Sequence, residues 1–140
     1  MGVLSNLEPA SVFYYFEEIC SIPHTSHHEK ALSDYCVQFA KAHGLACRQD
    51  EMGNVLIKAP ATPGYEKEPG LILQGHLDMV GDKTADCPLD LEKDAIHPVV
   101  DGGLCAPRAR PLAATTALPW PMRWLFWTQR TFPTLRWRSC

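Results

Sequence analysis

Residues 71–80 read LILQGHLDMV, and this stretch decides the fold class of the chain. It begins with a short apolar run, which is typical of a strand buried on both faces of a sheet. A glycine and the pattern His76-x-Asp78 follow this run directly. Because open α/β sheets place their ligand sites beyond the carboxyl ends of their strands, we expect a functional site at His76 and Asp78.

Two amphipathic helices are predicted upstream of this stretch. Apolar residues recur at helical spacing over about residues 9–20, which predicts the first helix. Ser26 and Glu29 match a capping box, in which the Ser hydroxyl accepts from the Glu29 N–H and the Glu carboxylate reaches back. The second helix then runs to its stop at Gly44. Its predicted buried stripe is Leu32, Cys36, Phe39 and Ala40.

A hairpin is predicted between the second helix and the apolar run. Residues 45–49 and 54–58 read as strands, and residues 50–53 between them read as a turn. A loop rich in Pro and Gly covers residues 59–69. Two helices, two strands, a loop and a further strand predict a layered α/β domain.

The His76-x-Asp78 pair has the residue types of half a metal site. An imidazole can give one nitrogen to a metal while a nearby carboxylate binds the other nitrogen, which fixes the tautomer and raises the basicity of the ligand. Spacing alone leaves a second interpretation open, because an H-x-D pattern is more often a turn or a hydrogen-bonded pair. His24, His27, His28 and Glu29 suggest a second metal site. Adjacent helical residues point about 100° apart, so we favour a plain helix start for this group.

Bulk features place the chain among soluble proteins of a reducing compartment. No apolar run approaches the roughly 20 residues of a membrane span, and the first residues lack the basic start and apolar core of a secretory signal. None of the six cysteines forms a C-x-x-C pair. We therefore predict free thiols and a cytoplasmic location.

The composition changes abruptly near position 103. Residues 1–103 hold all sixteen acidic residues and seven basic ones, whereas residues 104–140 hold six Arg, all four Trp and no Asp, Glu, Lys, Gly or His. We divide the chain at this point into a folded part and an irregular, poorly ordered tail. A basic, Trp-rich tail is also compatible with a non-enzymatic protein that binds membranes or nucleic acid. Five prolines in the tail argue against a long amphipathic helix there.

Four stretches resemble the aminoacyl-histidine dipeptidases, a family of two-zinc exopeptidases. They are residues 17–26 (EEICSIPHTS), 50–57 (DEMGNVLI), 73–80 (LQGHLDMV) and 90–102 (DLEKDAIHPVVDG). The likeness runs in register over about residues 8–103. It implies the N-terminal part of a zinc-exopeptidase catalytic domain, α/β with a mixed sheet.

The same resemblance implies a chemistry and a substrate. His76 corresponds to a ligand of one of two zinc ions, and Asp78 to the catalytic-site residue that orients it. Such metals polarise the scissile carbonyl and activate water, and the expected substrates are small peptides, chiefly Xaa-His dipeptides such as β-alanyl-histidine. No nucleic-acid or membrane partner is implied. The family's further carboxylate and His ligands have no counterpart in residues 104–140, and catalytic zinc needs about three protein ligands. We therefore expect the chain as written to be inactive.

The tail has a genetic interpretation. Shifting the reading frame back by one nucleotide from Ala109 permits GTTLGGDNGIAVA, the family's bridging-metal motif, with its Asp codon overlapping that of Thr115. A long match in one frame and at the expected place favours a frameshift. We interpret the chain from about Leu104 onward as translation in a shifted frame.

Overall fold

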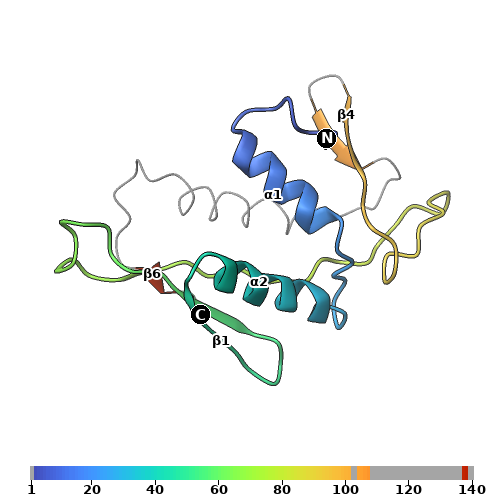
Figure 1. Cartoon of the computed structure of the whole chain (residues 1–140). Helices are drawn as coiled ribbons and strands as arrows, with labels where there is room; N and C mark the ends of the chain where they lie inside the picture. Colours follow the sequence, from blue (N-terminus) through green and yellow to red (C-terminus); the bar gives the residue numbers. More distant parts are fainter. Residues whose placement is uncertain (1, 102–103, 108–136, 139–140) are drawn as a thin grey trace.

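A computed structural model describes residues 2–101, 104–107 and 137–138 of the chain (Figure 1). The elements are α1 (Ala10–Cys20), α2 (Lys30–Ala42), β1 (Ala46–Gln49), β2 (Val55–Lys58), β3 (Leu71–Ile72), β4 (Pro98–Asp101), β5 (Leu104–Pro107) and β6 (Trp137–Arg138). The order of the first five confirms the predicted α, α, β, β, β sequence.

Helix α2 ends in a Schellman motif. Gly44 has a φ of 67° and donates its N–H to Lys41 O at 3.1 Å, while Leu45 donates to Ala40 O at 2.8 Å. These two bonds satisfy carbonyls that the helix end would leave without partners. The predicted stop at Gly44 is therefore confirmed. So is the predicted stripe, because Leu32, Cys36, Phe39 and Ala40 are all buried.

The β1–β2 hairpin forms where the sequence predicts it. Its strands pair antiparallel, with Ala46 opposite Lys58 and Gln49 opposite Val55. The turn is organised by the Asp50 carboxylate, which accepts the Met52 N–H at 3.0 Å. Asn54 donates to the same carboxylate from its backbone N–H at 2.8 Å and from its side-chain amide at 2.9 Å. Local side-chain bonds of this kind are why Asp and Asn favour turns.

Two buried clusters hold the elements together. The first is Ile19, Cys20, Leu32, Met79 and Ile96. The second is Cys36, Phe39 and Val55, which joins α2 to the hairpin that lies beside it in Figure 1. Leu77 packs against both clusters, so the segment that carries His76 and Asp78 is anchored on either side of Asp78 by buried or half-buried apolar residues.

The described strands form a mixed sheet, as the resemblance implies. Its order is β1-β2-β6-β3, with β1–β2 and β2–β6 antiparallel and β3–β6 parallel. Strands β4 and β5 form a separate antiparallel pair that spans position 103. Residues 108–136, which make up most of the predicted irregular tail, lie outside the described part.

The prediction that residues 71–74 are buried on both faces is wrong, because none of the four is buried. Leu71 is 38% exposed and Ile72 is 50% exposed. A strand is buried only where other elements cover both of its faces, and α2 packs on β1 and β2 instead. Met79, further along the chain, is only 4% exposed.

The predicted capping box at Ser26 and Glu29 is also wrong. Helix α2 begins at Lys30, and its N-cap residue Glu29 makes no side-chain capping bond. The Glu29 carboxylate accepts the N–H of His27 at 2.7 Å, while the Ser26 N–H is taken by Met79 O at 3.1 Å. The tertiary contact with Met79 therefore replaces the local capping pattern.

Two further findings concern the bulk predictions. Within the described part of the chain, Cys20, Cys36, Cys47 and Cys87 form no disulfide, and all but Cys47 are buried. Among the described residues, neither helix has the length and apolar character that crossing a membrane requires.

Candidate active site

The His76–Asp78 pair lies in the loop that follows β3. The Nδ1 of His76 is 2.9 Å from Asp78 Oδ1 and 2.9 Å from the backbone oxygen of Asp78. Both neighbours are acceptors, so Nδ1 carries the proton and donates to them. Nε2 is therefore the ring nitrogen whose lone pair suits a metal ion, which is the arrangement typical of metal-binding histidines.

A backbone bridge positions the turn after α1 beside this pair. Thr25 and Met79 form an isolated parallel bridge, in which Met79 donates to His24 O at 2.9 Å and accepts from the Ser26 N–H at 3.1 Å. Thr25 and Met79 are 5% and 4% exposed, so the bridge lies inside the molecule. It places Ser26 next to Asp78, and the Ser26 hydroxyl donates to Asp78 Oδ2 at 2.7 Å.

Hydrogen bonding keeps the Asp78 carboxylate ionised. The hydroxyl of Ser26 and then the imidazole of His76 lower the pKa of Asp78 below its ordinary value. Hydrogen bonds to a charged carboxylate favour that form over the protonated one. An ionised Asp78 is what the pair requires, because only a carboxylate accepts from both donors at once.

His24 is the buried histidine of this region, at 2% exposure. Its Nδ1 donates to Ile22 O at 2.6 Å. Burial lowers the pKa of His24, although the Ile22 carbonyl and the charge of Asp78 act in the opposite direction. His24 is therefore a neutral structural residue in the fold.

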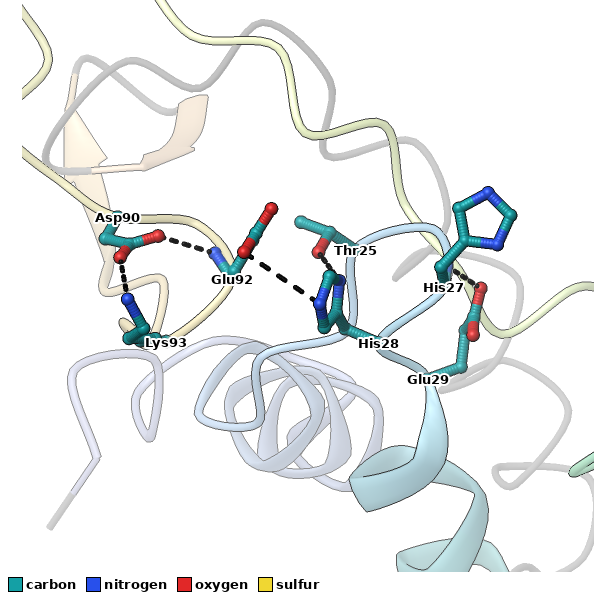
Figure 2. Close-up of polar contacts among 7 residues, drawn as sticks. All are labelled: Thr25, His27, His28, Glu29, Asp90, Glu92 and Lys93. Atoms are coloured by element: carbon teal, nitrogen blue, oxygen red, sulfur yellow. Dashed lines mark hydrogen bonds and ion pairs between the residues drawn. The ribbon is translucent and has the colours of Figure 1, made fainter.

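The other histidines of the suggested second metal site do not converge on a metal position. His28 lies 3.9 Å from Glu92 through its Nε2, and 3.4 Å from the Thr25 hydroxyl through its Nδ1. Figure 2 shows Glu29 bound to the backbone of His27, whose imidazole points away from His28 and Glu92. His27 has a φ of 72°, a left-handed conformation that is uncommon for a residue with a Cβ. The contact between this turn and residues 90–93 is made by His28 and Glu92.

A hollow of about 470 Å³ opens elsewhere, along α1. Its wall includes Tyr14, Glu17 and His97, but neither His76 nor Asp78. The carboxylate of Glu17 already accepts the Val3 N–H at 2.6 Å. The hollow is therefore separate from the candidate site.

Comparison with known proteins finds similarity to dipeptidases. The chain is 42% identical over 118 residues to the cytosol non-specific dipeptidase of Escherichia coli (strain K12), a match that covers 84% of this chain and 24% of that protein. The structure matches the crystal structure of aminoacylhistidine dipeptidase from Vibrio alginolyticus with a TM-score of 0.90 and 37% identity, covering 97% of this chain and 28% of that one. The chain corresponds to a fragment of a protein of the aminoacylhistidine dipeptidase family. No protein-family model matches it.

The chain spans about a quarter of the length of these dipeptidases. The family resemblance seen in the sequence is thereby confirmed, as is the α/β fold with a mixed sheet. The 118-residue match is longer than the 103 residues before the composition change, so the matched stretch includes some residues after that point.

The described residues do not complete a zinc site of the kind that a catalytic metal requires. They contain no cluster of three or more His, Cys, Asp or Glu side chains able to hold a metal ion. The site offers one imidazole and the carboxylate that orients it, whereas catalytic zinc needs about three protein ligands. The His76–Asp78 pair therefore has the side chains of a single metal-ligand position and no more.

Sequence reasoning missed Ser26 as a member of this site. The residue was predicted to act locally at the start of the second helix, and 52 positions separate it from its actual partner, Asp78. A capping pattern gave no indication of that contact, because only the bridge between Thr25 and Met79 brings the two segments together.

Proposed function

We propose that the chain carries one ligand position of a metal-dependent dipeptidase and does not itself hydrolyse dipeptides. The supporting observation is the geometry of His76, whose Nδ1 donates to Asp78 and whose Nε2 is thereby set to bind a metal. The proposed substrates of the intact enzyme are Xaa-His dipeptides such as β-alanyl-histidine. The proposed location is the cytoplasm, in keeping with the name of the Escherichia coli relative.

In the intact enzyme His76 would hold one of two zinc ions, and Asp78 would keep its ring in place. Bound divalent metals of this kind polarise a carbonyl and activate water. The role that we propose for this chain is limited to preparing the ligand His76. Asp78 holds the proton of His76 on Nδ1 and fixes the plane of the ring, and these are the properties that a ligand must have before a metal binds.

We further propose that the chain is read in a shifted frame from about Leu104. The support comes from the change in composition and from the hidden GTTLGGDNGIAVA sequence starting at the codon of Ala109. In the unshifted frame, the codon of the metal-bridging Asp would overlap the codon of Thr115. No nucleic-acid or membrane partner is part of this proposal.

The test compares the chain with a frame-corrected version of its gene. We expect no Xaa-His hydrolysis by the purified chain with added zinc. Insertion of one nucleotide near the codons of Gly103 and Leu104 should give a longer product that hydrolyses these dipeptides and binds zinc. In that product His76→Ala should abolish most activity, and Asp78→Ala should lower it about 10–100-fold.

Three results would contradict the proposal. The first is hydrolysis by the uncorrected chain that disappears with His76→Ala. The second is an early stop codon in the corrected frame. The third is a corrected enzyme whose activity is unchanged by both substitutions, which would remove the pair from the site while leaving the frame assignment intact.

A further inference from the structure

The Asp78 carboxylate is shared between two side chains from distant parts of the chain. One oxygen, Oδ1, accepts from His76 Nδ1 at 2.9 Å, and the other, Oδ2, accepts from the Ser26 hydroxyl at 2.7 Å. We propose that Ser26 is a positioning residue, which holds the Asp78 carboxylate in the orientation that fixes His76. This inference deepens the proposed function and depends on it for its biological meaning.

The backbone holds Ser26 in place independently of its side chain. Its N–H is bound to Met79 O at 3.1 Å, and the neighbouring Thr25 is 5% exposed. A Cβ on Gly81 would lie 3.4 Å from the methyl carbon of Thr25, so the chain on the other side of the bridge packs closely as well. Because the backbone of Ser26 is held in place, orienting its hydroxyl toward Asp78 costs little conformational entropy.

The Ser26 hydroxyl does not serve the helix that follows it. Helix α2 begins at Lys30 with Glu29 as its N-cap residue, and no side chain caps it. A Ser three residues before Glu is commonly bound to the helix backbone. Here its hydroxyl bonds to a carboxylate 52 positions away, so its contribution is to the site and not to the helix.

The arrangement also excludes Ser26 as a nucleophile. An activated serine donates its proton to a histidine, which is held in turn by a carboxylate. In this chain Ser26 and His76 both donate to Asp78, so the hydroxyl proton points to a carboxylate and not to the imidazole that such activation requires. Ser26 therefore acts through Asp78 and does not react.

The tautomer of His76 reports this role directly. In the full 140-residue chain without metal, ¹H–¹⁵N spectra of the imidazoles should show His76 with its proton on Nδ1. Ser26→Ala should raise the population of the Nε2–H tautomer about two- to tenfold, the change that corresponds to one ordinary hydrogen bond. Ser26→Thr keeps the hydroxyl and should restore the wild-type spectrum.

Ser21→Ala is the matched control. Its hydroxyl is also exposed and donates to a backbone oxygen, Glu18 O, at 2.6 Å, so the same atoms are removed away from the site. We expect the His76 signals of this variant to be unchanged. If Ser26→Ala disturbs the amide spectrum of the whole fold, Ser26→Cys replaces it, because a thiol is only a weak donor.

An unchanged His76 tautomer in a folded Ser26→Ala or Ser26→Cys variant would overturn the inference, as would the same tautomer change in Ser21→Ala. These outcomes require neither bound metal nor dipeptide turnover. A failure of the proposed dipeptidase function therefore leaves the spectra readable, and a failure of the Ser26 role leaves the enzyme assignment standing.

Discussion

Helix α2 with the β1–β2 hairpin, which we call the α2–hairpin unit, and the site segment, residues 71–80, are stabilised in different ways. The unit is closed by local contacts. Gly44 ends the helix, Asp50 orders the turn, and Phe39 and Val55 bury the interface. The site segment is exposed at Leu71 and is held through the bond of Met79 to a distant turn. A part of a protein can thus be locally complete while its functional segment still depends on long-range contacts.

The largest effect is expected when the same substitution, Leu to Ala, is made in both regions and the two losses of stability are compared. Leu32→Ala removes a side chain that is 2% exposed and packed in the first core cluster, so it should lower the free energy of unfolding by about 2–5 kcal/mol. Leu71→Ala removes the same atoms from a strand residue that is 38% exposed and should cost less than about 1 kcal/mol. Urea denaturation followed by circular dichroism measures both values. Equal losses would mean that the start of the site segment at Leu71 is as well packed as α2 at Leu32.

An intermediate effect is expected at the end of α2. Gly44→Ala places a Cβ on a residue whose φ is 67°, where nothing lies within 4 Å of the added atom. The cost is therefore conformational and should be about 1–2 kcal/mol. Gly44→Asn should recover part of it, because Asn tolerates the left-handed region. Thermal unfolding ranks the stabilities of the wild type and the two variants. A Gly44→Ala variant as stable as the wild type would contradict the Schellman motif at the end of α2.

The smallest effect should appear as a pH dependence near the site. Burial lowers the pKa of His24 in the folded chain, so the unfolded chain takes up this proton first as the pH falls. The stability contributed by neutral His24 is complete above its unfolded pKa of about 6.5, and it is lost as the pH falls below that value. Denaturation midpoints between about pH 7 and pH 5 measure this slope.

Two variants compare the contribution of His24 to this pH dependence with that of an exposed histidine. His24→Gln should flatten the slope between these pH values, whereas His97→Gln changes an exposed residue and should leave it as in the wild type. A slope that persists in His24→Gln would assign the pH dependence to other groups.

Local rules were sufficient for most of the α2–hairpin unit. Its helix stripe, its glycine stop and its turn follow from periodicity and from residues at most five positions apart, and all three were predicted. The same local reasoning failed at Ser26 and at Leu71. In both places the outcome depends on which distant segment lies alongside, and spacing within the sequence carries no information about that.

The sequence by itself determined the family resemblance, the two helices, the hairpin and the choice of His76 and Asp78, because each depends on short-range patterns or on a contiguous motif. Only the tertiary structure decided that Ser26 binds Asp78 and that the apolar run begins exposed. The bridge between Thr25 and Met79 brings two segments together and redirects the Ser26 hydroxyl from a helix end to a carboxylate. Burial of the strand depended on where α2 packs, and α2 packs on β1 and β2. A side chain uses the strongest partner within reach, and the fold sets which partners those are.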